Sequence, residues 1–204
     1  MVITKKTVWN TRIKHYQKEH ESSHKDKSRL YILDRMRQKD IGSILELGVG
    51  SGILLDNMRA CGLTSIKYSG IDASKEFIRV TKKKYPKMHI VEHDFDQTLP
   101  FPDFSYDITY ARHVIEHCKH YKPVIREMAR VAIKEVIVIT FRPFEENDKI
   151  DFRKHKGTYY NSYSEKNVRV LCDELFSKYD IIELGGNKVG PSHQGKNWII
   201  HGLK

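Results

Sequence analysis

Long apolar segments, a signal-like leader and paired cysteines are all missing from this sequence of 204 residues. No apolar stretch approaches the roughly 20 residues that a helix needs to cross a bilayer, and the opening MVITKKTVWNTRIKHYQ lacks the continuous apolar core of a secretory signal. The three cysteines, Cys61, Cys118 and Cys172, are odd in number, far apart and outside any CxxC motif, which argues against a disulfide framework. We expect a soluble, cytoplasmic protein with reduced thiols.

Internal repeats, low-complexity tracts and Pro/Ser-rich linkers are also lacking, so no internal domain boundary is evident. A chain of 204 residues with 39% hydrophobic residues is long enough to bury one core of ordinary size. The sequence therefore predicts a single domain over residues 1–204.

Acidic residues are in the minority, and the formal net charge is +10. Residues 1–40 hold eleven Lys/Arg against five Asp/Glu, which is six of the ten excess positive charges. This distribution predicts a basic N-terminal helical arm at about 1–40, at the edge of a nearly neutral catalytic domain, where it could steer an anionic substrate or nucleic acid. The alternative is a solvated helix that only aids solubility.

Short β-rich runs alternate with segments of helical periodicity. Strands are expected at 43–47, 67–71, 89–91, 106–110, 135–140, 181–184 and 197–201. This alternation predicts an α/β fold, a doubly wound and mostly parallel seven-stranded sheet with helices on both faces. Because no helix fits between the last two runs, we expect an antiparallel last strand.

A glycine-rich loop follows the first expected strand, in the segment ELGVGSG. Its glycines are Gly48, Gly50 and Gly52, whereas a dinucleotide-binding loop would need its third glycine at position 53, where Ile53 stands. The GxGxG spacing shortens the turn and fits a nucleoside joined to an amino acid better than a pyrophosphate.

Acidic residues end the second and third expected strands. Asp72 lies 20 residues after Gly52, where a carboxylate can accept hydrogen bonds from both ribose hydroxyls of a nucleoside. Asp94 could accept a hydrogen bond from an adenine amino group, and the neighbouring Phe95 could cover the ring. Parallel neighbouring strands bring these positions to one crevice.

The segments ELGVGSG, YSGIDAS and HDFDQTLPFPDFSYDITYARHVIEH together resemble class I, Rossmann-like, S-adenosylmethionine-dependent methyltransferases over residues 40–140. The resemblance implies S-adenosyl-L-methionine as cofactor and S-adenosyl-L-homocysteine as product. The cofactor-binding residues that it implies are Glu46, Gly48, Val49, Gly50, Gly52, Asp72, Ala73, Ser74, Asp94, Phe95, Ala111 and Arg112. The segment 130–135 differs from the family pattern, because the family usually has a glycine-rich turn before the fifth strand and this segment contains no glycine.

The acceptor should bind beyond the carboxyl ends of the strands, as ligands do in parallel sheets. Three segments follow such ends: 111–113, 142–162 and 189–196. The candidate substrate-binding residues in the last two are Arg142, His155, Tyr159, Tyr160 and His193. In the first, His113 is the candidate general base, because the ordinary pKa of a histidine, about 6.5, suits removal of a proton from a hydroxyl or amine.

The motif His113-Val-Ile-Glu-His117 also permits a second interpretation. On a helical turn the two histidines would share one face beside Glu116, a spacing that can bind a divalent metal. Small-RNA 2′-O-methyltransferases carry a similar ExxEH motif, but its first Glu is missing here. Because such EH pairs are also found without metal, we expect no metal site.

Three functions remain open on the sequence. The preferred one is a methyltransferase that acts on an oxygen or nitrogen of a small-molecule acceptor. The alternative is an RNA methyltransferase, of the metal-assisted 2′-O type or another, which binds nucleic acid through the basic arm; the absence of an Asn/Asp-Pro-Pro-aromatic motif argues against exocyclic base amines. The third is a non-catalytic module, against which the intact glycines and acidic residues count. The sequence predicts no membrane partner and leaves the oligomeric state open.

Overall fold

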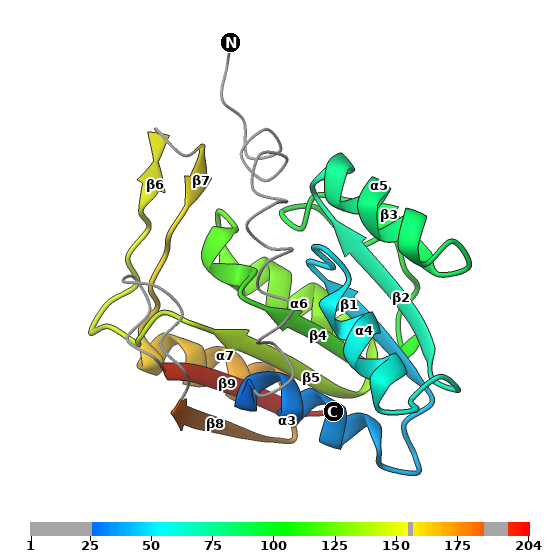
Figure 1. The fold of residues 1–204 in the computed structure, drawn as a ribbon. Helices are drawn as coiled ribbons and strands as arrows, with labels where there is room; N and C mark the ends of the chain where they lie inside the picture. Colours follow the sequence, from blue (N-terminus) through cyan, green and yellow to red (C-terminus); the bar gives the residue numbers. More distant parts are fainter. Residues whose placement is uncertain (1–25, 155–156, 186–195) are drawn as a thin grey trace.

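The structure is a computed structural model that describes residues 26–154, 157–185 and 196–204. Seven strands form one sheet in the order β3-β2-β1-β4-β5-β9-β8, and β6 and β7 form a separate hairpin (Figure 1). The strands are β1 Ser43–Leu47, β2 Lys67–Asp72, β3 His89–Glu92, β4 Tyr106–Arg112, β5 Ala132–Thr140, β6 Phe152–Arg153, β7 Thr158–Tyr159, β8 Lys178–Gly185 and β9 Lys196–Leu203. The helices are α3 Lys27–Met36, α4 Ile53–Ala60, α5 Lys75–Lys84, α6 Tyr121–Val131 and α7 Glu165–Leu175, with a short 3-10 helix at Ile115–His117. Within these ranges, no helix has the length and apolar character required to span a membrane.

The direction of the strands confirms the predicted fold class. Strands β1 to β5 pair in parallel with their neighbours, whereas β9 is antiparallel to both β5 and β8. The register aligns Leu47 at the end of β1 with Ile71 of β2 and Ala111 of β4. The carboxyl ends of the three central strands therefore meet at one edge of the sheet.

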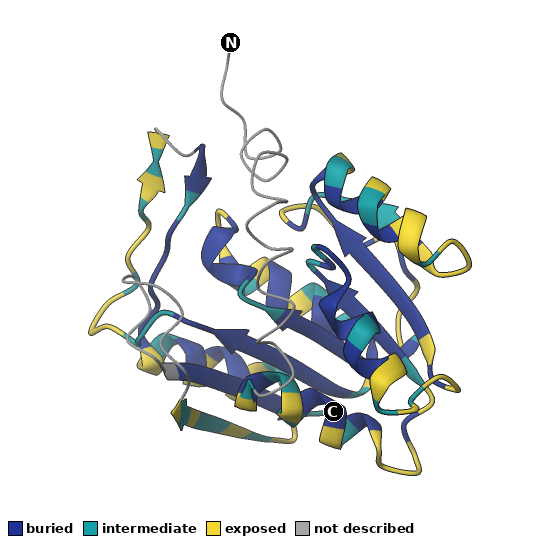
Figure 2. Cartoon of the chain, viewed as in Figure 1, coloured by how far each residue is buried: buried dark blue, intermediate teal, exposed yellow. Residues whose placement is uncertain are grey.

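Helices cover both faces of the sheet, as Figures 1 and 2 show. Apolar side chains of α3, α4 and α5 pack on one face against Ile44, Ile108 and Ile137. Helices α6 and α7 pack on the other face against strand residues such as Leu45 and Val138. Alternate residues of one strand thus enter different cores, which explains why the central strands are apolar nearly throughout.

The departure at segment 130–135 has a structural explanation, because α6 runs directly into β5 without an intervening turn. The C-terminal carbonyls of the helix need partners. Two of them, on Arg130 and Val131, accept hydrogen bonds from the backbone N–H groups of Phe104 and Ser105. The segment before β4 therefore replaces the usual glycine-rich turn.

The long segment after β5, expected as a loop with aromatic and charged residues, contains the hairpin β6–β7. This hairpin stands away from the seven-stranded sheet, beyond the end of β5 (Figure 1). The rings of Phe152 and Tyr159 pack across it with centroids 4.9 Å apart. Its first strand is more exposed than its second (Figure 2).

Helix α3 is fixed to the sheet by a buried carboxylate, Glu135 at the amino end of β5. Glu135 accepts hydrogen bonds from the guanidinium of Arg35 and from Nε2 of His201 at 2.9 Å, and Nδ1 of His201 lies 2.7 Å from the hydroxyl of Tyr31. Burial by itself would raise the pKa of Glu135, but His201 and Arg35 outweigh it and hold the pKa at about 2.

We expect Glu135→Gln to lower the free energy of unfolding at pH 7 by about 3 kcal/mol, because it removes the buried negative charge that Arg35 and His201 stabilise. The native pKa lies below the ordinary value of 4.5, so this stabilisation is present above pH 4.5 and is lost as the pH falls toward 2. Urea unfolding followed by circular dichroism at pH 7 and pH 3 measures both effects. The control is Glu174→Gln, which removes an exposed pair with Arg126 and should cost less than about 1 kcal/mol. Equal losses in the two variants would contradict the role of Glu135.

Candidate active site

The glycine loop after β1 adopts a backbone that only glycine takes easily. Gly48, Gly50 and Gly52 have φ angles of 78°, 54° and 79°, all in the left-handed region. A Cβ atom on Gly48 would lie 2.3 Å from Cγ2 of Val114, so a side chain cannot fit there. A Cβ on Gly50 would meet no atom of residues 26–154, 157–185 or 196–204 closer than 4.0 Å, so these residues leave space at that point of the loop.

Asp72, the last residue of β2, is bound to this loop. Its Oδ2 accepts a hydrogen bond from the backbone N–H of Gly50 and its Oδ1 accepts one from the N–H of Ser74, both at 2.8 Å. Burial raises the pKa of Asp72 to about 6, although the backbone N–H groups of Ser74, Gly50 and Ala73 lower it. A carboxylate has about four acceptor sites, so both oxygens retain capacity for a ligand.

A second buried carboxyl group, Glu46, lies on β1 just before the glycine loop. Its Oε2 accepts a hydrogen bond from the hydroxyl of Tyr68 at 2.5 Å, and its side chain is nearly inaccessible to solvent. Burial raises the pKa of Glu46 to about 8, against the opposing effects of Tyr68 and Arg29. A positive group bound beside Glu46 would favour its ionised form.

Arg29 in the first turn of α3 is a candidate site residue that the sequence analysis missed. It interacts electrostatically with Glu46, yet it forms no ion pair at hydrogen-bond distance among the described residues. Burial and the nearby charge of Arg112 lower its pKa to about 10. The turn is anchored because Arg112 pairs with Asp26 at 2.8 Å and with Ser28 at 2.9 Å. The only local signal was Asp26, the helix cap.

Other residues implied by the resemblance have visible structural roles. Val49, Ala73 and Ala111 are buried beside the loop and strand ends, and Ser74 caps the N-terminus of α5 by accepting from the N–H of Phe77. The side chain of Arg112 anchors α3 through Ser28 and Asp26.

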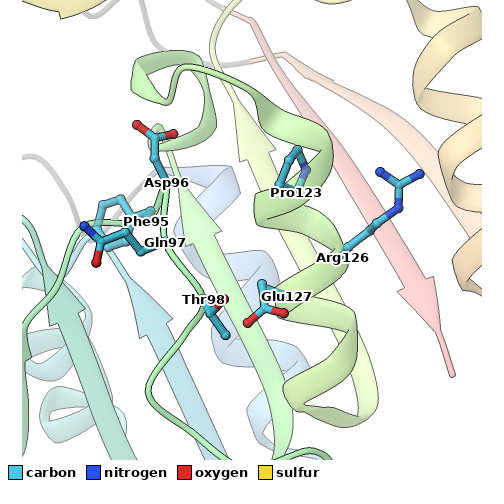
Figure 3. Close-up of a pocket in the computed structure, with 7 residues that line it drawn as sticks. All are labelled: Phe95, Asp96, Gln97, Thr98, Pro123, Arg126 and Glu127. Carbon is cyan, nitrogen blue, oxygen red and sulfur yellow. The ribbon is translucent and has the colours of Figure 1, made fainter.

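The residues after β3, expected at the adenine, form a turn next to α6. Oδ1 of Asp94 accepts from the N–H of Asp96 at 3.2 Å, and the ring of Phe95 is buried in the core under α6. Phe95 also lines a pocket of about 300 Å³ between this turn and α6 (Figure 3). Its lining residues are Phe95, Asp96, Gln97, Thr98, Pro123, Arg126 and Glu127. Neither the loop glycines nor Asp72 line it, so this pocket does not include the glycine loop.

His113, the candidate base, follows β4 with an unusual backbone conformation. Its φ of 56° lies in the left-handed region, and its backbone N–H donates to the carbonyl of Ile139 on β5 at 2.8 Å. Nε2 of His113 lies 2.7 Å from Oδ1 of Asn197 on β9. The ring packs edge-on against Phe141 with centroids 5.0 Å apart. Two strands therefore position this imidazole.

The shared helical face considered for His113 and His117 is wrong. The left-handed conformation of His113 excludes it from a helix, and only Ile115–His117 form a 3-10 turn. The ring of Phe141 packs against both histidines, and Nδ1 of His117 donates to the carbonyl of Tyr159 at 2.7 Å. Within the described part of the chain, no group of three His, Cys, Asp or Glu side chains is placed to hold a metal.

Glu116 joins the turn after β4 to the end of β5. Its Oε1 accepts from the backbone N–H of Phe141 at 2.7 Å, and the side chain is completely buried. Burial raises the pKa of Glu116, although a hydrogen bond from Thr140 lowers it. The position of Glu116 gives the Glu116-His117 pair a structural role, because Glu116 links the ends of the neighbouring strands β4 and β5.

The candidate substrate-binding residues are only partly brought together. Tyr160 is buried against the ring of His117, with centroids 5.0 Å apart, and the guanidinium of Arg153 lies 4.2 Å from the Tyr160 ring centroid. Arg142 follows β5 and is held by Ser162. Tyr159 lies on the hairpin strand β7. His155 and His193 lie outside the described residues, as do residues 1–25 of the basic arm.

Comparison with known proteins supplies the family. A model described as a methyltransferase domain matches residues 45–140. The pavine N-methyltransferase of Thalictrum flavum subsp. glaucum is 32% identical over 117 residues, which cover 53% of this chain and 32% of that enzyme. The chain matches curated relatives over 32% to 45% of their length.

Solved structures share the fold over most of the chain. One chain of the Haloferax volcanii complex that contains the Trm112 methyltransferase activator has a TM-score of 0.72 at 16% identity, covering 100% of this chain and 99% of that chain. The magnesium protoporphyrin IX methyltransferase of Synechocystis PCC 6803, solved with bound S-adenosylmethionine, has a TM-score of 0.58 at 15% identity, covering 93% of this chain and 79% of that chain. At these identities the likeness concerns the fold.

The matched residues 45–140 contain the glycine loop, Asp72 and the end of β4, which is the part of the fold where the site lies. The order of the strands and the left-handed conformations of the loop glycines agree with the fold that the family match indicates. Over residues 45–140 the chain carries a methyltransferase domain of the class I, Rossmann-like superfamily, whose cofactor is S-adenosylmethionine.

Proposed function

We propose that the protein transfers a methyl group from S-adenosylmethionine to an oxygen or nitrogen atom of a small-molecule acceptor. The observation that carries the proposal is His113, an imidazole fixed by Asn197 at the carboxyl end of β4. The sulfonium supplies an already activated methyl group, so the protein mainly aligns the acceptor and removes its proton. The name of the relative pavine N-methyltransferase supports a small-molecule acceptor.

The charged groups around the glycine loop suit the cofactor. In this proposal the free acceptor capacity of Asp72 binds the ribose hydroxyls, Glu46 faces the ammonium group and Arg29 binds the carboxylate of the methionine part. Burial raises the pKa of Asp72 and of Glu46 and lowers the pKa of Arg29, so each of these groups would gain from a ligand group of complementary character. Asp94 and Phe95 are proposed to lie near the adenine.

His113 is suited to act as the base through its Nδ1 atom. The amide oxygen of Asn197 can only accept a hydrogen bond, so the facing Nε2 of the imidazole carries the proton. In the neutral ring Nδ1 is then the basic atom and can take a proton from the acceptor. Asn197 therefore selects the tautomer in this proposal.

The alternative, an RNA methyltransferase that uses the basic arm, has less support from the described part of that arm. Arg35 and Arg37 pair with Glu135 and Asp34, so these positive charges are matched within the fold. Arg29 lies near Glu46, Lys27 and Lys39 are exposed, and the other six lysines and arginines of the arm lie in residues 1–25, outside the described residues. The small-molecule acceptor therefore stands as the proposal.

We expect Asp72→Ala to weaken S-adenosylmethionine binding at least about tenfold, because hydrogen bonds to a charged group are lost. The pKa of Asp72 is about 6 in the free protein, so wild-type affinity should fall as the pH drops below 6 and the carboxylate is protonated. Isothermal calorimetry from pH 5 to pH 8 measures both effects, with Glu174→Gln as control. If the wild type binds no S-adenosylmethionine, the proposed function is wrong.

Arg29→Gln should weaken binding of S-adenosylhomocysteine at least about tenfold, because the carboxylate of the amino-acid part loses its cation. Binding of 5′-methylthioadenosine, which lacks that carboxylate, should be unchanged. The matched control is Arg59→Gln, which removes an exposed arginine. An equal loss for both ligands would show that Arg29 maintains the fold of the site and does not bind the carboxylate.

His113→Asn should lower kcat at least about 100-fold, the usual loss when a general base is removed, while the affinity for S-adenosylmethionine stays unchanged. Asn197→Ala should lower kcat by a smaller factor and change its pH profile, because the imidazole loses its fixed tautomer. Transfer of a tritiated methyl group to fractionated metabolite pools first identifies an acceptor. A kcat for His113→Asn close to that of the wild type would exclude His113 as the base.

A further inference from the structure

Most arginines in the described part of the chain are paired with carboxylates. Of the eleven arginines in these ranges, eight form a salt bridge with Asp or Glu. The three without such a bridge among the described residues are Arg29, Arg59 and Arg142. Arg59 is exposed, where water solvates the charge, whereas Arg29 and Arg142 are partly buried. Both partly buried exceptions lie near carboxyl ends of central strands, where this fold binds its ligands.

Arg142 is held in one orientation by a neutral group. Its Nε and Nη2 lie 3.1 Å and 3.0 Å from Oγ of Ser162, which is completely buried. Its backbone N–H donates to Oγ1 of Thr140 at 3.2 Å. Among the described residues, this hydroxyl oxygen is the partner of the guanidinium and no carboxylate pairs with it, so its charge is unmatched there and its other N–H groups are available. A half-buried cation in such a position fits an anion supplied by a ligand.

Two acidic side chains of the same segment, Asp148 and Asp151, have other partners. Asp148 accepts hydrogen bonds from the N–H of Ser164 at 2.7 Å and from Tyr121. Asp151 pairs with Arg153 at 2.9 Å. These two carboxylates therefore bind other groups, whereas Arg142 has the neutral hydroxyl of Ser162 as its partner.

The location of Arg142 connects it with the proposed acceptor site. It directly follows Phe141, whose ring packs against His113. Strand β5 ends next to β4, and the N–H of His113 donates to the carbonyl of Ile139, three residues before Arg142. The candidate base and the unmatched guanidinium thus follow neighbouring ends of two parallel strands.

We infer that Arg142 binds an anionic group of the methyl acceptor, a carboxylate or a phosphate, and that the substrate is therefore a small organic acid or phosphate ester. The inference rests on the proposed function, since it assigns the substrate class of that same site. The planar fork of a guanidinium suits both anions, because each offers two oxygens to adjacent N–H groups. Arg142 is a specificity residue here, and the base remains His113.

Direct anion binding tests this inference without any methyl transfer. The full-length protein, saturated with S-adenosylhomocysteine, is titrated with inorganic phosphate and separately with acetate at constant ionic strength, and binding is followed by NMR chemical shifts. We expect saturable binding of at least one anion, weakened at least about tenfold in Arg142→Gln and unchanged in Arg59→Gln. Binding of phosphate alone points to a phosphate ester, and binding of acetate alone to a carboxylic acid.

Two results would overturn the inference: no saturable binding of either anion to the wild type, or equal binding by the wild type and Arg142→Gln. Unchanged S-adenosylhomocysteine affinity in Arg142→Gln establishes that the variant is folded. Arg142→Lys, which keeps the charge but not the fork, should recover part of the anion affinity. Failure of the wild type to bind S-adenosylhomocysteine would instead contradict the proposed function.

Once an acceptor is found by tritium transfer, its charge gives a second test. The labelled product should be retained on an anion exchanger, and Arg142→Gln should raise KM for the acceptor by a larger factor than it lowers kcat. A neutral or cationic acceptor would overturn the inference while leaving the methyltransferase assignment intact.

Discussion

The contact between Asp72 and the Gly50 peptide is the interaction on which the rest of the site depends. The carboxylate accepts from the N–H of Gly50, and the hydroxyl of Thr81 on α5 donates to the carbonyl of the same residue at 2.8 Å. Asp72 also accepts from the N–H of Ser74 at the start of α5. Both backbone groups of Gly50 are thus hydrogen-bonded, so the loop after β1, the end of β2 and helix α5 are joined into one unit by the protein's own hydrogen bonds.

Buried carboxyl groups in and beside this unit link the binding of a ligand to the uptake or release of protons. Burial raises the pKa of Asp72 to about 6 and that of Glu46 to about 8, so both carboxyl groups are costly to ionise in the free protein. Hydroxyl donors beside Asp72 and a cation beside Glu46 favour the ionised forms. In the proposed binding mode, the amino-acid part of the cofactor would therefore release protons on binding near neutral pH, and Arg29 would supply the positive charge for its carboxylate.

The fold and half of the site could be predicted because their signals are local in sequence. Alternating apolar runs locate the strands, and the GxGxG spacing with Asp72 locates the loop. The other half depends on contacts between distant residues: Arg112 meets Asp26, and His113 meets Asn197, across 86 and 84 positions. The hydrophobic periodicity of the sequence carries no signal for such long-range pairs. The hairpin β6–β7 was missed since each strand has two residues, too short to alternate.

The antiparallel last strand has a chemical consequence as well as a topological one. In the register of β5 and β9, Trp198 pairs with Thr140, so Asn197 lies just beyond the last pair. Because β5 lies between β4 and β9, the imidazole of His113 must reach across the end of β5 to meet Asn197. The left-handed conformation of His113 redirects the chain there, and the hydrogen bond to Ile139 secures it. Because β9 is antiparallel, it begins at this edge of the sheet and supplies Asn197 from its first residues, whereas a parallel strand would place its last residues here.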